Sequence, residues 1–142
     1  MAKGMFRPTK PEKYLGDVTK IRFLSHWELK FMQFCDLNPR ILNWASEELQ
    51  IPYIHPFKKR RAAYWPDFLI RYQDPTGKLL TEVIEIKPQK QTHQTKKSST
   101  YDKVQLAINY AKWEAAKSYC DSAGMTFKVL TEQPLVRGSS MR

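Results

Sequence analysis

Two apolar runs joined by a short turn dominate the pattern of hydrophobic and polar positions between residues 64 and 91. The first run reads Y-W-P-D-F-L-I-R-Y, the second reads L-L-T-E-V-I-E-I-K, and D-P-T-G lies between them. Pro and Gly in such a tetrapeptide are typical of a turn. The flanking residues predict strands over residues 63–72 and 79–87. Because both faces of the second strand carry apolar residues, we expect a central strand covered on both sides.

A first helix is predicted to begin at Ser25 and to end near Asp36, before an Asn-Pro pair. The tetrapeptide S-H-W-E has the form of a capping box, in which Ser25 and Glu28 satisfy each other's backbone donors. Glu28 also shares one helix face with an apolar stripe, at the i, i+3, i+4, i+7 spacing. It therefore has two interpretations, a helix cap or an acid that points at the strands. The stripe consists of Phe31, Met32 and Cys35.

The longest predicted helix spans residues 101–123, and a short strand over residues 125–130 follows it. Ser99 or Thr100 can cap its start, and Gly124 is positioned to stop it. We expect the helix to pack on the sheet through one stripe, with its lysines mainly off that stripe. The predicted stripe consists of Val104, Ile108, Ala111, Ala115 and Tyr119, and the lysines off it are Lys103, Lys112 and Lys117.

The segment between the first helix and the two strands has a less clear pattern. I-L-N-W-A-S-E-E-L-Q-I-P-Y predicts an edge strand over residues 44–51 that Pro52 ends. Glu47 and Glu48 point to opposite faces of such a strand. Either one of them approaches the acids of the neighbouring strands, or both are solvated.

The predicted order is helix, three strands, helix and strand, which favours an α/β fold with a mixed central sheet flanked by helices. A chain of 142 residues is expected to form a single domain with its own core, and no internal repeat is visible. Residues 1–20 hold two prolines and five basic residues and predict an extended basic arm, which is either a frayed terminus or a segment that contacts DNA. Residues 132–142 predict a loose tail.

The charge balance of the chain favours an anionic partner. Lys and Arg number 24 against 14 Asp and Glu, a formal net charge of +10, and nucleic acid is the commonest partner of so basic a protein. A membrane is the other anionic surface, but the sequence has no strongly basic amphipathic helix and no apolar run of about 20 residues. Residues 1–13 lack the apolar core of a signal peptide. We therefore expect a protein of the reducing cytoplasm, or of a particle assembled there, without a membrane partner.

The candidate chemistry lies in carboxylates, because the two cysteines and three histidines have neither disulfide nor zinc spacing. Asp67 follows Pro66 in the first apolar run, and Glu85 shares a strand face with Lys87 in the second. Two acids on neighbouring strands can hold Mg²⁺ through oxygen ligands, and Mn²⁺ can substitute for it. A lysine beside them can orient or deprotonate water and offset charge on a phosphate. The set predicts phosphodiester cleavage.

Two basic segments flank these acids and are candidates for contacting a DNA backbone. One is a four-residue run at a predicted hairpin tip, for which an ordinary solvated turn is the alternative. The other is a polar, mobile loop predicted over residues 88–100, for which a flexible linker is the alternative. The candidate cations are Lys58, Lys59, Arg60 and Arg61 in the run, and Lys90, Lys96 and Lys97 in the loop.

P-D at residues 66–67 followed by E-I-K at residues 85–87 resembles the PD-(D/E)xK nuclease superfamily, whose restriction-endonuclease-like core has the order αβββαβ. The blocks S-H-W-E-L-K-F-M, W-A-S-E-E-L-Q-I-P-Y, W-P-D-F and V-I-E-I-K-P-Q-K-Q resemble, more narrowly, the head-completion nucleases of T4-like tailed phages. The endonuclease subunits of heteromeric cut-and-paste transposases are similar in the same four places. The resemblance extends over about residues 14–131.

The resemblance implies a role for each matching residue. Asp67 and Glu85 are expected to bind the metal, and Lys87 is expected to be the catalytic lysine. Glu28 is expected to be a further acid of the active site, supplied by the first helix, and a third ligand of the metal. Gln91 is a lesser candidate for contact with phosphate or water. The products of such an enzyme carry a 5′ phosphate and a 3′ hydroxyl.

The phage resemblance implies an endonuclease for double-stranded DNA that processes DNA ends during head completion. Its expected partners are head or portal proteins, and its expected location is the host cytoplasm during assembly, or the virion. Two alternatives stay open, an end-cleaving transposase subunit and a non-catalytic head-completion protein that grips DNA. The transposase subunits carry an additional C-terminal domain, whereas this sequence ends at Arg142.

Overall fold

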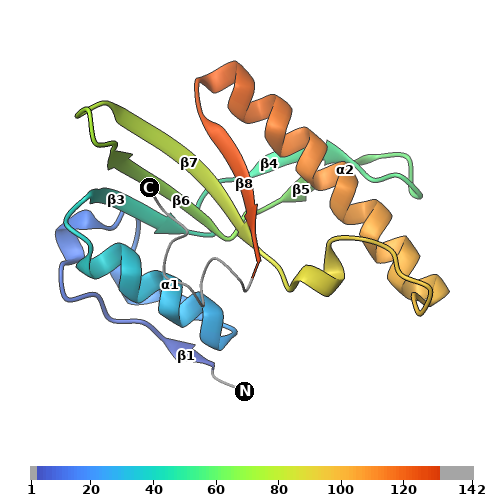
Figure 1. The fold of residues 1–142 in the computed structure, drawn as a ribbon, viewed down its shortest axis with the longest axis horizontal. Helices are drawn as coiled ribbons and strands as arrows, with labels where there is room; N and C mark the ends of the chain where they lie inside the picture. Colours follow the sequence, from blue (N-terminus) through green and yellow to red (C-terminus); the bar gives the residue numbers. More distant parts are fainter. Residues whose placement is uncertain (1–2, 132–142) are drawn as a thin grey trace.

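The computed structural model describes residues 3–131, which are arranged around a mixed four-stranded sheet (Figure 1). The strands follow one another in space as β3 (Ile41–Ser46), β6 (Phe68–Gln73), β7 (Leu79–Ile86) and β8 (Thr126–Leu130). The β3–β6 and β6–β7 pairs are antiparallel, whereas β8 runs parallel to β7. A parallel connection needs a crossover, and helix α2 (Thr100–Ala123) supplies it. The prediction of a central strand over β7 is confirmed.

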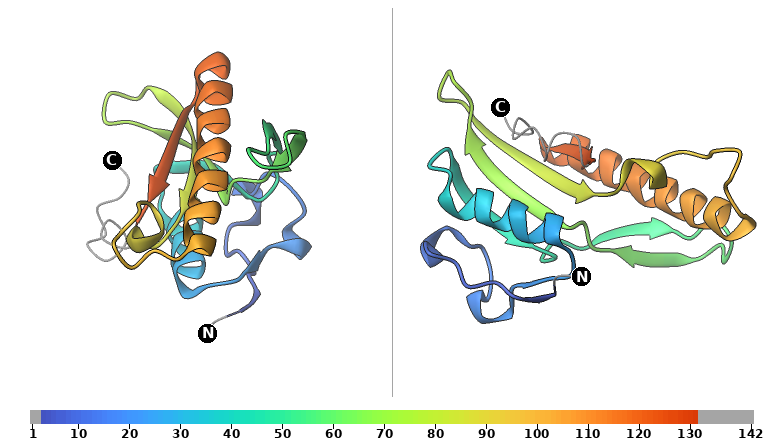
Figure 2. Two further views of the ribbon diagram at one scale, coloured as in Figure 1. Left: turned by 90° about the vertical axis from the view of Figure 1, so that its right-hand side faces the viewer. Right: turned by 60° about the horizontal axis from the view of Figure 1, so that its bottom comes forward.

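Helix α1 (His26–Leu37) covers one face of this sheet, and α2 lies on the other (Figure 2). The predicted apolar stripe of α1 is buried against side chains of β3, β6 and β7, among them Trp44, Phe68 and Ile84. Fully burying each such side chain contributes roughly 1.5–3 kcal/mol to folding. The predicted α/β class and the order helix, three strands, helix, strand are confirmed, with a further hairpin inserted between β3 and β6.

The prediction of a single edge strand over residues 44–51 is wrong, because this range holds the end of β3 and the start of the inserted hairpin. The chain leaves β3 at Glu47, whose φ is 54°, and forms β4 (Ile51–Ile54), which pairs with β5 (Arg61–Tyr64). Pro52 lies within β4 rather than ending it. A two-stranded sheet permits this because both strands are edges, where the missing N–H costs no ladder bond.

The first apolar run also forms two strands rather than the one predicted over residues 63–72. The W-P-D tripeptide at residues 65–67 separates β5 from β6, in keeping with the inability of proline to donate to a ladder. The predicted turn after β6 is confirmed. Asp74 Oδ1 accepts hydrogen bonds from the backbone N–H groups of Thr76 and Lys78, and Gly77 takes a φ of 86°. β6 and β7 therefore form one hairpin with a fixed register.

Residues 3–20 are packed against the core, so the prediction of an extended basic arm is wrong for them. Phe6 and Tyr14 are buried with their rings edge-on to Trp44. The Asp36 carboxylate, near the end of α1, accepts hydrogen bonds from two backbone N–H groups of the segment. Its apolar side chains hold it on the core, and one basic side chain helps: the buried Lys13 ammonium group donates hydrogen bonds to the carbonyls of Asp36 and Asn38. The elements here are β1 (Gly4–Met5), η1 (Pro11–Lys13), η2 (Val18–Lys20) and β2 (Arg22–Phe23), and β1 pairs with β2.

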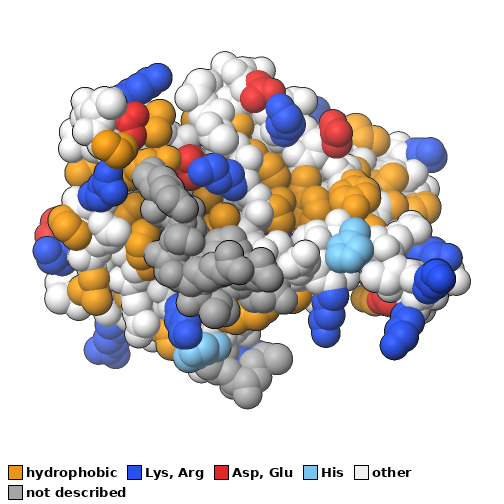
Figure 3. Space-filling model, viewed as in Figure 1, with side chains coloured by type: hydrophobic (Ala, Val, Ile, Leu, Met, Phe, Trp, Pro, Cys, Tyr) orange, Lys and Arg blue, Asp and Glu red, His pale blue; other side chains and the backbone are white. Residues whose placement is uncertain are grey.

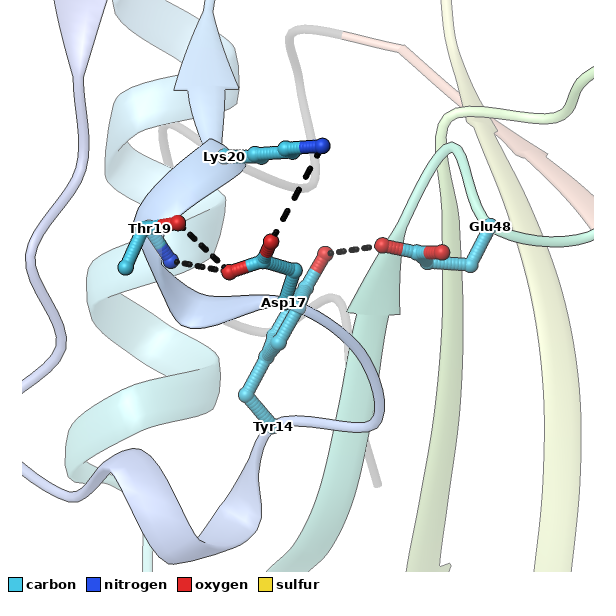
Figure 4. A network of polar contacts seen from close by, with 5 residues as sticks. All are labelled: Tyr14, Asp17, Thr19, Lys20 and Glu48. Atoms are coloured by element: carbon cyan, nitrogen blue, oxygen red, sulfur yellow. Dashed lines mark hydrogen bonds and ion pairs between the residues drawn. The ribbon is translucent and has the colours of Figure 1, made fainter.

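Tyr14 fastens this segment to the end of β3 (Figure 4). Its hydroxyl accepts a hydrogen bond from the Ser46 N–H at 3.0 Å and donates one to Glu48 Oε2 at 3.3 Å. Burial raises the pKa of Tyr14 to about 12, so the hydroxyl keeps its proton. Figure 4 also shows Asp17 accepting from Thr19 at the start of η2. Glu48 is thus directed at Tyr14, and of the two acids after β3 only Glu47 lies beside the candidate site described below.

Helix α2 has the predicted ends but only part of the predicted stripe. Ser99 and Asp102 form a capping box, and Gly124 ends the helix in the left-handed conformation, with a φ of 72°. Tyr119, predicted to face inward, is 38% exposed. The buried face is rotated because α2 packs on the β4–β5 hairpin as well as on β8. Its most buried side chains are Leu106, Ala116 and Cys120.

The tail predicted over residues 132–142 lies outside the described residues. Between residues 3 and 131, neither α1 nor α2 is long and apolar enough to cross a membrane. The described body thus consists of the α/β layers, the β4–β5 hairpin and the packed N-terminal segment.

Candidate active site

Asp67 and Glu85 lie opposite each other on the two central strands. The β6–β7 ladder pairs Phe68 with Ile84, so one further step along each strand brings Asp67 to Glu85. Side chains opposite one another in an antiparallel pair have Cβ atoms about 4.5–5.5 Å apart. The backbone is held at this point, because the Asp67 carbonyl accepts a hydrogen bond from the Glu47 N–H at 3.1 Å. Since Phe68 and Ile84 pack towards α1, the two acids face the α2 side.

Each of the two carboxylates is held by a specific donor. Asp67 Oδ2 accepts a hydrogen bond from the Ile86 N–H at 2.8 Å, which ties it across to β7. Glu85, only 6% exposed, accepts a 2.7 Å hydrogen bond at Oε1 from the Tyr64 hydroxyl. Its other oxygen, Oε2, lies 3.7 Å from Lys87 Nζ. The hairpin therefore brings together the three residues that the sequence singled out, Asp67, Glu85 and Lys87.

The two carboxylates disfavour each other's negative charge. Burial and the neighbouring Glu85 raise the pKa of Asp67 to about 8, against the opposing effect of its hydrogen bond from Ile86. Burial also raises the pKa of Glu85, although the Tyr64 hydrogen bond and the Lys87 charge oppose that rise. Such like-charge pairs in a partly dry setting are typical of sites that bind a cation or a proton.

Glu28 lies at the edge of this site and also caps its own helix. Its Oε1 accepts a hydrogen bond from the Leu24 N–H at 3.0 Å, while the Ser25 hydroxyl accepts from the Glu28 N–H at 3.1 Å. The predicted capping box is therefore confirmed on the Ser25 side, but the Glu28 side chain binds one residue further back. Burial raises the pKa of Glu28, and the Glu28 charge contributes to the raised pKa of Asp67. Both interpretations of Glu28 thus have a basis in the structure.

The donor set fits a divalent cation. Asp67 and Glu85 offer carboxylate oxygens, which Mg²⁺ prefers, and a bound cation relieves the repulsion that raises their pKa values. Among residues 3–131, no three Asp, Glu, His or Cys side chains gather tightly enough to form a complete metal site. Glu28 therefore stands beside the Asp67–Glu85 pair rather than converging with it.

The sequence pattern missed Tyr64, Trp65 and Lys112 around the pair, whereas it left open that Glu47 approaches the acids. Tyr64, Trp65 and Glu47 line a cavity of about 390 Å³ together with Glu85. Lys112 of α2 lines the same cavity, with Nζ 5.7 Å from the ring centroid of Tyr64, and its charge lowers the pKa of Glu85. Alternation alone marked Tyr64 as an ordinary strand residue. The sequence places Lys112 off the inward stripe because it predicts the inward face of α2 without the β4–β5 hairpin.

The candidate DNA contacts are exposed and lie in the two predicted segments. The run from Lys58 to Arg61 is at the tip of the β4–β5 hairpin, where Lys59 takes a φ of 57°. The loop candidates are on the polar segment between β7 and α2, in which Gln89–Gln91 forms a short 3₁₀ helix. Figure 3 shows Lys and Arg side chains gathered where this segment meets the start of α2, at the right of the view. The exposed loop candidates are Lys90, Gln91, Lys96 and Lys97.

A groove of about 710 Å³ opens beside Lys87, between residues 88–98 and α2. Lys90, Gln91 and Lys97 line its loop wall, whereas Lys96 is not among its lining residues. Lys112 lines both this groove and the smaller cavity around Glu85. The groove and the acids are therefore adjacent parts of one surface.

Comparisons with known proteins agree with this geometry. Residues 38–132 match the family described as "TnsA-like endonuclease N terminal", and this range includes Asp67, Glu85 and Lys87. The chain is 34% identical to the head completion nuclease of Enterobacteria phage T4, over 93% of this chain and 92% of that protein. No solved structure matches the chain significantly. The resemblance drawn from the sequence blocks is confirmed, and the chain belongs to the family of TnsA-like endonuclease N-terminal domains.

Proposed function

We propose that this protein is a Mg²⁺-dependent endonuclease that hydrolyses phosphodiester bonds of double-stranded DNA. The observation that carries the proposal is the placement of Asp67 opposite Glu85 on adjacent strands, with Lys87 Nζ 3.7 Å from Glu85 Oε2. Membership of an endonuclease family supports the reaction class. The formal charge of +10 supports a nucleic-acid substrate.

Each residue of the site has a distinct role in this proposal. Asp67 and Glu85 hold the cation through carboxylate oxygens, and Tyr64 fixes the orientation of Glu85 through its hydrogen bond. When bound, the cation polarises the phosphate and lowers the pKa of water. Lys87 orients or deprotonates the attacking water and offsets the charge that builds up on the phosphate. Glu28 adds a third negative charge at the edge of the site.

We further propose that the reaction processes DNA ends during phage head completion. Similarity over nearly the whole chain to a phage protein named for head completion supports this setting. Head or portal proteins are then the partners, and the protein acts in the host cytoplasm during assembly or within the virion. An end-cleaving subunit of a transposase is the second candidate, which the family match also supports.

A cleavage assay tests the enzymatic part of the proposal. Supercoiled and linear DNA are incubated with the protein in Mg²⁺, in Mn²⁺ and in EDTA. We expect cleavage with either metal, none in EDTA, and a loss of roughly 100-fold or more for Asp67→Asn and Lys87→Met. Glu114→Gln, an exposed acid of α2, is the matched control. Equal cleavage by wild type and Asp67→Asn would show that the pair is not the active site.

A phage experiment tests the biological setting. Particles assembled with Glu85→Ala protein should be defective if cleavage is required for head completion. Normal infectivity would instead favour a non-catalytic protein that grips DNA by its charge. Capture of a transposase by the wild-type protein, in place of head proteins, would favour the second candidate.

A further inference from the structure

The groove beside Lys87 has the size of a small-ligand site. Its volume of about 710 Å³ falls within the roughly 300–1,000 Å³ of pockets that hold small molecules and cofactors. An uninterrupted duplex is far larger than such a pocket. The loop wall is fastened in place, because the Tyr110 hydroxyl of α2 donates a 2.7 Å hydrogen bond to the Thr92 carbonyl.

The helix wall of the groove is a single stripe along α2. Tyr101, Gln105, Asn109 and Lys112 follow one another at spacings of four, four and three residues and all line the groove. At 1.5 Å per residue, the stripe extends for about 16 Å along the helix axis. Tyr101, at the end away from the acids, is 71% exposed and offers a free ring face.

Three amide side chains in the groove have no hydrogen-bond partner among the residues that the structure describes. Gln91, Gln105 and Asn109 line it, and none of their side chains makes a hydrogen bond within residues 3–131. Amides offer both donors and acceptors, which suits the edges of nucleobases. Lysines supply the positive charge of the groove. Asp102 also lines it, but its carboxylate already accepts a hydrogen bond from the Ser99 N–H of the helix cap.

Two lysines connect the groove to the acids. Lys87 lines the groove and lies 3.7 Å from Glu85, and Lys112 lines both the groove and the cavity that contains Glu85. A chain of nucleotides with one phosphate at Glu85 would therefore continue into the groove.

We infer that this groove holds a short single-stranded segment of the DNA substrate, next to the phosphate that is cleaved. The lysines contact its phosphates, the amides contact base edges, and Tyr101 stacks on a base. Only unpaired bases expose both edge and face in this way. The inference rests on the proposed function and specifies its substrate as DNA with an unpaired end or branch at the cleavage point.

Binding to matched DNAs tests the inference. The same labelled duplex is prepared blunt, with a single-stranded extension of about four nucleotides, and with that extension made abasic; fluorescence anisotropy is measured in Ca²⁺, without cleavage. One stacked base is worth about 1–3 kcal/mol, so we expect the extension to tighten binding by about tenfold and the abasic extension to lose most of the gain. Equal binding of blunt and extended DNA overturns the inference. So does full competition by a free deoxynucleoside monophosphate, which would indicate a mononucleotide site.

Variants on one helix locate the effect. Tyr101→Ala and the double variant Gln105→Ala, Asn109→Ala should each weaken binding of the extended DNA by about tenfold. Tyr119→Ala, at the other end of α2, is the matched control and should bind like wild type. Wild-type binding by Tyr101→Ala and by the double variant, with unchanged circular dichroism, overturns the inference. A cleavage assay in Mg²⁺ distinguishes failure of the proposed function from failure of this inference. If no DNA is cleaved, the proposed function is refuted. If DNA is cleaved but blunt and extended DNA bind equally, only the single-strand site in the groove is refuted.

Discussion

The Tyr64 hydroxyl donates a 2.7 Å hydrogen bond to Glu85 Oε1, deep in the sheet and beside Asp67. The same kind of contact occurs three residues earlier on β7, where the Tyr72 hydroxyl donates to Glu82 Oε2, also at 2.7 Å. The second pair lies next to Lys128 of β8 and outside the candidate site. The two Tyr–Glu contacts are chemically alike, so one serves as an internal control for the other.

Tyr64→Phe is expected to move metal binding to higher pH. The Tyr64 hydrogen bond lowers the pKa of Glu85, so its loss raises that pKa, and only a deprotonated carboxylate binds the metal. Calorimetric titration with Mn²⁺ from about pH 6 to pH 8 measures the shift. Tyr72→Phe, which removes the same group from Glu82, should leave the pH dependence unchanged. Equal shifts in both variants would mean that Tyr64 has no special role at the site.

The metal-free protein is expected to lose stability as the pH rises. The pKa of Asp67 is about 8 in the folded state and about 3.9 in an unfolded chain. The folded state therefore binds the Asp67 proton more tightly than the unfolded chain does. The stability gained in this way is complete below the pKa of the unfolded chain and is lost as the pH rises through the pKa of the folded state. Urea unfolding in EDTA, at several pH values from about 4 to about 9, gives the slope.

Asp67→Asn should flatten that slope, since it removes the group with the large shift. In Asp67→Asn the free energy of unfolding should still fall somewhat as the pH rises, because burial also raises the pKa values of Glu85 and Glu28. A steep slope that is the same in wild type and in Asp67→Asn would show that Asp67 is ionised throughout.

Lys112→Met is expected to slow cleavage without unfolding the protein. Its ammonium group lies over the rings of Tyr53 and Tyr64, at 5.9 and 5.7 Å from their centroids, and its charge lowers the pKa of Glu85. Methionine keeps the apolar stem but removes the charge, so the cleavage rate should fall by roughly tenfold or more, with a higher optimal pH. Lys117→Met, an exposed lysine of the same helix, is the control. If both variants cleave like wild type, Lys112 has no part in the reaction.

Tyr14→Phe is expected to destabilise the fold by about 1–3 kcal/mol, the cost of leaving a buried donor without a partner. The variant removes the acceptor of the Ser46 N–H and the donor to Glu48. Urea unfolding measures the change, and Tyr119→Phe, on the exposed side of α2, should be nearly neutral. No loss of stability in Tyr14→Phe would indicate that the N-terminal segment is not fastened through this residue.

Local signals explain what the sequence predicted well. The caps at Ser25 and Ser99, the stop at Gly124 and the turn after β6 each depend on a few neighbouring residues. The same holds for Asp67, Glu85 and Lys87, because a tight turn and strand alternation fix their relative positions.

Tertiary contacts explain what the sequence missed. Glu47 leaves β3 through a positive φ, which is uncommon for glutamate and has no sequence signature. Phe6 and Tyr14 carry no periodic pattern, yet they pack on Trp44, which is distant in the sequence. Lys112 faces the site only because α2 also covers the β4–β5 hairpin. Each of these outcomes depends on a partner far along the chain.

The hairpin that carries Asp67 and Glu85 has a consequence for folding kinetics. The two residues are 18 positions apart (85 − 67), whereas Glu28 is 39 positions from Asp67 (67 − 28). Contacts of short sequence separation close small loops and form early. The pair of acids should therefore assemble with the β6–β7 hairpin, before α2 docks and builds the groove wall. Metal binding would then be the first functional property that the folding chain acquires, and the selection of DNA structure the last.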